Sequence, residues 1–286
     1  ALAAPRRWDP AGPAAPGRAT GARPAPVPLG PLRVPVGLAA WTVLGAALGL
    51  PLAVFAGWAV RGGGEPPFPG GDAVTFLSGP VVNSAAVSVA AAAVTAIALL
   101  PTALASVRRP GPLARATTAL VTSTLALPGL VTALALVFFA LGAPGPLGLL
   151  YQSFPLLVLG YVLHFGAQSL RASQAAVAAV PAQLHETARL LGAGPWRRFV
   201  TIDVPLLLPG VAAGAGLVML STLKELPATA LLAPIGFDTL ATSIYFAAED
   251  GFFGEVGVAS LVLVAVSAGL TWGLVVRPGA SSRARA

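Results

Sequence analysis

The sequence contains no cysteine, and only 9% of its 286 residues are charged. The absence of cysteine excludes disulfides and thiolate metal sites. About a quarter of the residues in a soluble globular domain are charged, so this chain carries too little charge to be one. Hydrophobic residues make up 56% of the chain, and its mean hydropathy is +0.83. The composition therefore indicates an integral membrane protein.

Residues typical of catalytic and metal sites are also scarce. The two histidines, His164 and His185, lie apart in the sequence without metal-ligand spacing. The sequence shows no nucleophile elbow, no phosphate-binding glycine-rich loop and no paired carboxylate motif. We therefore expect a chain that is not itself an enzyme, has no metal site and binds no cofactor.

Long uncharged runs predict six transmembrane helices. A helix needs about 20 apolar residues to cross the hydrocarbon core, and one of the five runs is long enough for two helices. The runs are 34–60, 73–107, 116–170, 204–223 and 256–276. The fold class is therefore all-α integral membrane. The spans are expected at 36–60, from 81 onwards, at 117–141 with a break at 127–131, at 151–170, from Pro205 to Glu225, and at 256–276.

The arginines predict the orientation of these spans. Fifteen of them lie before the first span, in alternate loops or after the last span: Arg6, Arg7, Arg18, Arg23, Arg33, Arg108, Arg109, Arg115, Arg171, Arg189, Arg197, Arg198, Arg277, Arg283 and Arg285. Six acidic residues lie in the other loops: Glu65, Asp72, Asp238, Glu249, Asp250 and Glu255. Positive residues mark the cytoplasmic side, so both termini are expected there. The net charge of +7 then reflects topology and not nucleic-acid binding.

Composition divides the chain into three parts. Residues 1–33 are rich in Pro, Ala and Arg and predict a cytoplasmic tether without the apolar core of a signal peptide. Residues 34–276 form the six-helix domain, and residues 277–286 form a basic cytoplasmic tail. The acidic segment 238–255 is expected to form a short amphipathic helix on the membrane or a docking surface for a partner.

The segment 186–205 is a polar interruption between the fourth and fifth spans. Gly192 is expected to end a first short helix, and Pro195 suits the first turn of a second one. The apolar side chains on these helices include Leu190, Leu191, Trp196 and Phe199. A helix-turn-helix of this kind either lies on the membrane surface or fits a groove on a partner protein.

This segment resembles the cytoplasmic loop of ABC importer permeases that work with a substrate-binding protein. That pattern reads Glu-Ala-Ala, three residues, Gly, nine residues, Ile, one residue and Leu-Pro. The matching positions are Glu186, Ala188, Gly192, Ile202 and Pro205, with Thr187 and Val204 as mild departures. The resemblance implies that the loop couples the permease to a cytoplasmic ATPase dimer. The ATPase would bind the loop through the apolar side chains of Leu190, Leu191, Trp196 and Phe199. An ordinary interfacial hairpin is the alternative.

Two further segments narrow the resemblance. Residues 223–229 and 236–242 resemble iron(III) permeases more than molybdate, sulfate, polyamine or thiamine permeases. Iron permeases usually carry two six-helix halves in one chain, and this sequence resembles the second half. The start at Ala1 fits a piece of a longer chain, whereas a complete half-size permease that pairs with itself is the alternative. The resemblance implies a bacterial inner membrane, an extracytoplasmic binding protein, and ATP consumed by the ATPase.

Four polar residues are candidates for a translocation pathway: Lys224, Glu225, His164 and Asn83. Ionisable groups inside a span usually face a water-filled cavity or one another. Alternatively, Lys224 and Glu225 anchor the helix end at the interface, and the other two form interhelical hydrogen bonds. For the whole chain, the alternatives are a secondary transporter or channel without an ATPase, a membrane scaffold, or an ABC permease for another solute such as phosphonate.

Overall fold

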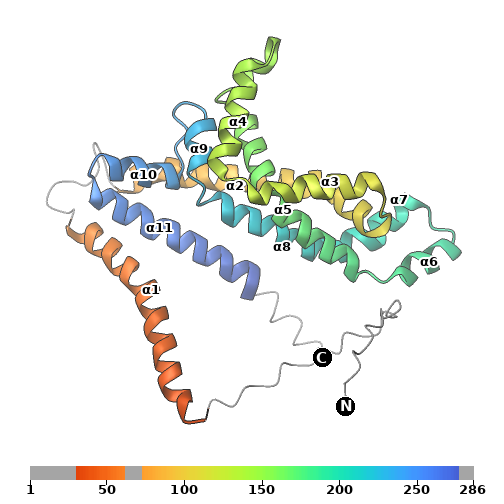
Figure 1. Cartoon of the computed structure of the whole chain (residues 1–286), viewed down its shortest axis with the longest axis horizontal. Helices are drawn as coiled ribbons and strands as arrows, with labels where there is room; N and C mark the ends of the chain where they lie inside the picture. The colour runs from red at the N-terminus through yellow and green to blue at the C-terminus, as the bar shows by residue number, and fades with distance from the viewer. Residues whose placement is uncertain (1–29, 62–72, 277–286) are drawn as a thin grey trace, which may run out of the picture. The chain divides into compact units, whose positions relative to one another are not determined.

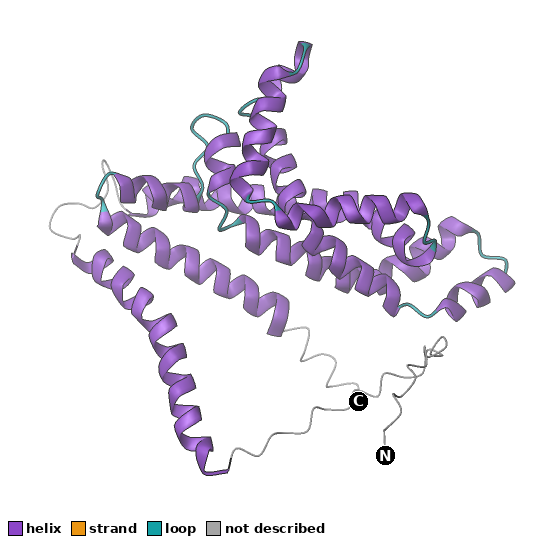
Figure 2. Cartoon of the chain, in the orientation of Figure 1, coloured by secondary structure: helices purple, strands orange, loops and turns teal. Residues whose placement is uncertain are grey.

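The computed structural model describes residues 30–61 and 73–276, and every regular element in these ranges is helical (Figure 2). The chain divides into two compact units, residues 1–49 and 50–286, with the division inside helix α1, Arg33–Arg61. Most of the predicted tether and the whole predicted tail lie outside the described residues. The domain boundaries therefore stay predictions.

Three long helices form the core of the larger unit and lie side by side (Figure 1). They are α2, Ala73–Arg108; α5, Phe154–Ala179; and α8, Val204–Thr222. Small residues allow α5 and α8 to approach closely: a Cβ added to Gly214 would lie 2.9 Å from the Cβ of Ala172. Lipid tails are as apolar as the helices, so the hydrophobic effect does not drive helices together inside a membrane. Close packing and interhelical hydrogen bonds stabilise their association instead. Gln168 and Ser221 form one of these bonds, at 3.1 Å.

The predicted third span consists of two helices rather than one. Helix α3, Pro112–Ser123, continues into the 3₁₀ turn η2, Thr124–Ala126, and α4, Gly129–Gly142, follows at an angle of 114°. Proline lacks an N–H and pushes the preceding residue out of the helical region, and Leu127 is accordingly extended before Pro128. The break is therefore where the sequence predicted it, but a single helix over 117–141 is wrong. Figure 1 shows α4 turning away from the core helices.

Among the described residues, four helical segments are long and apolar enough to cross a membrane: Gly30–Arg61, Phe76–Arg108, Pro195–Thr222 and Phe253–Leu274. The bent α3–α4 pair raises the number to five if it counts as one span. The predicted span at 151–170 lies in α5, which is not among them because polar residues such as His164 and Gln168 lower its hydropathy. The described residues thus support four or five spans, against the six predicted.

The fifth predicted span starts earlier than expected. Helix α7, Pro195–Arg198, runs without a break through the π-helix η4, Phe199–Asp203, into α8, so the predicted start at Pro205 is wrong.

Helix α10, Leu240–Glu249, matches the short helix expected in the acidic segment 238–255. The remaining elements are η1, Gly30–Leu32; η3, Gly145–Leu150; α6, Ala182–Leu190; α9, Pro227–Leu232; α10, Leu240–Glu249; α11, Phe253–Thr271; and η5, Trp272–Val276.

Candidate functional site

The segment that resembles a coupling loop consists of α6, a glycine turn and α7. Gly192 has a φ of +76°, which glycine adopts without the steric cost that other residues meet. Its N–H donates to the carbonyl of Arg189, and the N–H of Ala193 donates to the carbonyl of Ala188, both at 2.9 Å. These two bonds form a Schellman motif, which satisfies the last carbonyls of α6 and stops the helix. The direction of α7 therefore depends on Gly192.

The apolar side chains of this loop are largely uncovered. Leu190, Leu191 and Trp196 are 89%, 83% and 75% exposed. Phe199 is half-buried, with its ring centroid 5.8 Å from that of Trp196. Large apolar side chains gathered on one surface typically mark a protein or membrane contact. Glu186 and Pro205 are also exposed, whereas Ala188 and Ile202 are half-buried.

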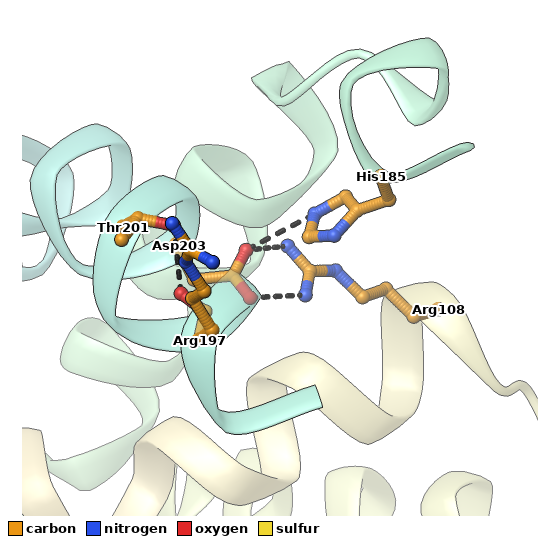
Figure 3. Close-up of polar contacts among 5 residues, drawn as sticks. All are labelled: Arg108, His185, Arg197, Thr201 and Asp203. Carbon is orange, nitrogen blue, oxygen red and sulfur yellow. Dashed lines mark hydrogen bonds and ion pairs between the residues drawn. The ribbon is translucent and has the colours of Figure 1, made fainter. Parts of the chain in front are cut away.

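A buried carboxylate ties this loop to the core (Figure 3). Asp203, in the π-helix η4, is only 4% exposed. The guanidinium of Arg108, at the end of α2, donates a hydrogen bond to each carboxylate oxygen of Asp203, with Nη1 3.0 Å from Oδ2. His185 of α6 brings its Nε2 to 3.2 Å from Oδ1. Bidentate charge-assisted pairs are strong and geometrically specific, so the Arg108–Asp203 pair joins η4 to α2. His185 makes no hydrogen bond through its Nε2 to any described residue, so α6 packs against this pair without being bonded to it.

Two pathway candidates, His164 of α5 and Glu225 just after α8, lie close to the break between η2 and α4. A Cβ added to Gly129 would lie 3.0 Å from Oε1 of Glu225 and 3.1 Å from Nε2 of His164. The same Oε1 accepts a hydrogen bond from the N–H of Ala228, at 3.1 Å, and so caps α9. The Nδ1 of His164 is buried and has no hydrogen-bond partner among the described residues.

The other two candidates lie elsewhere. Lys224 is exposed and faces α11 across a hollow of about 540 Å³. Asn83 donates to the carbonyl of Asp238 at 2.9 Å, and its neighbour Ser84 accepts from the N–H of Leu240 at 2.8 Å. These bonds attach α2 to the start of α10. The structure thus brings together His164 and Glu225, but not Lys224 or Asn83.

A comparison with models of protein families finds a match over most of the chain. The family model described as "Binding-protein-dependent transport system inner membrane component" matches residues 81–277. The match includes the glycine turn, the Asp203 cluster and the break at Pro128. The chain belongs to this family.

The permease is similar to ABC permeases for several solutes. It is 32% identical over 197 residues to the Fe(3+)-transport system permease protein FbpB 2 of Haemophilus influenzae, covering 69% of this chain and 38% of the relative. It is 34% identical over 119 residues to the molybdenum transport system permease protein ModB of Escherichia coli K12, covering 41% of this chain and 46% of the relative. Each match thus spans less than half of the relative.

Sequence reasoning missed the role of Asp203 in the permease. The signal was present, because Asp203 directly precedes the apolar run of the fifth span. A carboxylate at such a position is costly to bury unless a cation pairs with it. Its partners could not be chosen from the sequence, since several arginines lie at the predicted cytoplasmic ends of the spans.

Proposed function

We propose that the permease is the membrane subunit of an ATP-driven importer, and that its solute is iron(III) delivered by an extracytoplasmic binding protein. The observation that carries the proposal is the exposed apolar loop around Trp196, which is joined to two core helices through Asp203. A separate cytoplasmic ATPase dimer binds this loop and hydrolyses the ATP. A second six-helix half, from the same longer chain or from a second copy, completes the pathway.

The contacts of the loop suggest how closure of the ATPase reaches the spans. A displacement of α7 moves the carboxylate of Asp203 directly, because α7 continues into η4. A displacement of α6 moves the imidazole of His185, which packs against the same carboxylate. Because Asp203 is also held by Arg108, the displacement acts on both α2 and the helix that runs from η4 into α8. Beyond the end of α8, Glu225 faces His164 and Gly129 at the break in the bent pair. Movement of α8 would therefore change the surroundings of this carboxylate.

Uptake into proteoliposomes tests the proposed function. The permease would be reconstituted with the ATPase and binding protein of the same transport system. We expect radiolabelled iron(III) to enter only when both proteins and ATP are present. Excess molybdate, sulfate, thiamine, polyamine or phosphonate should not compete. Iron uptake driven by an ion gradient without the ATPase would establish a secondary transporter, and competition by one of the other solutes would reassign the substrate.

Cysteine labelling tests the proposed orientation. The chain has no cysteine, so any labelling reports only the introduced residue. A cysteine at Gly251 should react with an impermeant maleimide in intact cells. Cysteines at Gly111 and Gly194 should react only after permeabilisation, because the surrounding arginines place them in the cytoplasm. Labelling of Gly194 from outside would contradict both the orientation and the docking of an ATPase.

Glu225→Gln is expected to lower uptake about tenfold or more without changing the amount of permease in the membrane. A glutamine can still accept the hydrogen bond from Ala228, so the cap of α9 persists while the charge is lost. Initial uptake rates normalised to membrane abundance provide the measurement. Glu249→Gln, which removes an exposed carboxylate from α10, is the matched control. Equal rates in the two variants would show that Glu225 only anchors the helix.

A further inference from the structure

A polar pocket lies at the end of α2 opposite to Arg108 and is lined by residues of α2, α10 and the start of α11. Figure 1 shows these three helix ends close to one another. Its volume is about 430 Å³. Three carboxylate residues line it: Asp238 before α10, Asp250 after α10, and Glu255 in the first turn of α11. No lysine or arginine is among the described residues that line it. The pocket is therefore strongly acidic.

Glu255 forms the buried part of this pocket, and one of its two carboxyl oxygens is unpaired among the described residues. The residue is 4% exposed, and its Oε1 has no hydrogen bond to any residue in the described ranges. Nearly all buried polar atoms in native proteins are hydrogen-bonded, since an unpaired one loses its hydration without compensation. Because Glu255 lines the open pocket, a small shift of its side chain would let this carboxyl group accept a hydrogen bond from a ligand there.

The remaining walls indicate which ligand fits. Asp238 and Asp250 are exposed at the rim, beside the aromatic rings of Phe246 and Phe252, which are 46% and 50% exposed. Carboxylates together with aromatic faces attract organic cations, through charge-assisted hydrogen bonds and cation–π contacts. Within residues 30–61 and 73–276, no group of three His, Asp or Glu residues is placed to hold a metal ion. The pocket therefore suits an organic cation better than a metal.

We propose that this acidic pocket binds a guanidinium or ammonium group, with Glu255 as its hydrogen-bond acceptor. Asp238 and Asp250 add attraction at the rim, and the cation lies against the ring face of Phe246 or Phe252. The group comes either from an Arg or Lys side chain of a protein that docks on this end or from a free organic cation. The proposal concerns the pocket alone and does not depend on the transported solute.

Titration calorimetry on the full chain in lipid nanodiscs tests this site. The probes are agmatine, which is a free guanidinium compound, and the blocked peptide acetyl-Ala-Arg-Ala-amide. We expect saturable binding of at least one probe with a dissociation constant in the millimolar range or tighter. Glu255→Gln should weaken it at least about tenfold, which corresponds to about 1.4 kcal/mol. Glu249→Gln removes a nearby carboxylate that does not line the pocket, and it should leave the affinity within about twofold.

A second variant keeps the test decisive if Glu255→Gln alters folding. Asp250 is exposed, so Asp250→Asn should fold normally and weaken binding about threefold. Tighter binding of the peptide identifies a protein side chain as the source of the cation, and tighter binding of agmatine identifies a free solute. The absence of saturable binding of both probes would overturn the proposal. Equal weakening by the Glu249 and Glu255 variants would overturn it as well.

Discussion

Gly192→Val is expected to abolish uptake and to reduce recovery of the ATPase with the permease about tenfold or more. Gly192 has a φ of +76°, which a β-branched residue cannot adopt without strain. Valine would therefore extend α6 or distort the turn, and both changes would redirect α7 and its exposed Trp196. Insertion into the membrane should be unaffected, because the turn lies outside the spans. Co-purification of the ATPase, together with uptake, provides the measurement.

Gly194→Val is a closely matched control for this experiment. A Cβ at either glycine meets no atom within 4 Å, so both substitutions have the same open space. Gly194 differs in having a φ of −64° and a ψ of 165°, which valine adopts readily. We expect the Gly194 variant to retain the ATPase and most of its uptake. Undiminished ATPase recovery and uptake in the Gly192 variant would show that the loop merely lies on the membrane.

Asp203→Ala is also expected to abolish uptake, but for a different reason. The substitution removes the ion pair that joins the loop to α2, whereas the loop still binds the ATPase. Removing one member of a buried ion pair typically costs about 3–5 kcal/mol, because the other charge stays behind. The Arg108 side chain is 30% exposed, so water offsets part of that cost, and we expect about 2–3 kcal/mol. The exposed surface formed by Leu190, Leu191 and Trp196 is unchanged. ATPase recovery should therefore remain within about twofold of the parent.

A double-mutant cycle with Arg108→Ala isolates this interaction. Because each single substitution leaves the other charge unpaired, the double variant should be more stable than the sum of the two losses implies. Thermal unfolding in nanodiscs measures the stabilities, and limited proteolysis reports loosening around α6. Asp250→Ala, which removes an exposed carboxylate, is the control. Additive effects of the Asp203 and Arg108 substitutions would mean that the pair does not join the loop to the core.

Features of this protein that depend on local chemistry can be predicted from its sequence. Uncharged runs identify a membrane protein because every span must be apolar over its own length. The helix stop at Gly192 depends on that residue and the carbonyls of its own last turn, so it is encoded within a few positions. Pro128 also favours a break locally, because proline lacks an N–H. Pro51 and Pro209 nevertheless lie inside continuous helices, and the 114° angle between α3 and α4 does not follow from proline alone.

Features that join distant parts of the chain depend on how the helices pack against one another. Asp203 and Arg108 are 95 positions apart, and only the packing of α2 against α8 brings them together. Lys224 and Glu225 are neighbours in sequence and both follow the end of α8 at Thr222, but their side chains lie in different surroundings. The polar residues of α5 gave it low hydropathy, although its neighbours bury much of it. Such outcomes depend on which helices pack together, and no local pattern contains that information.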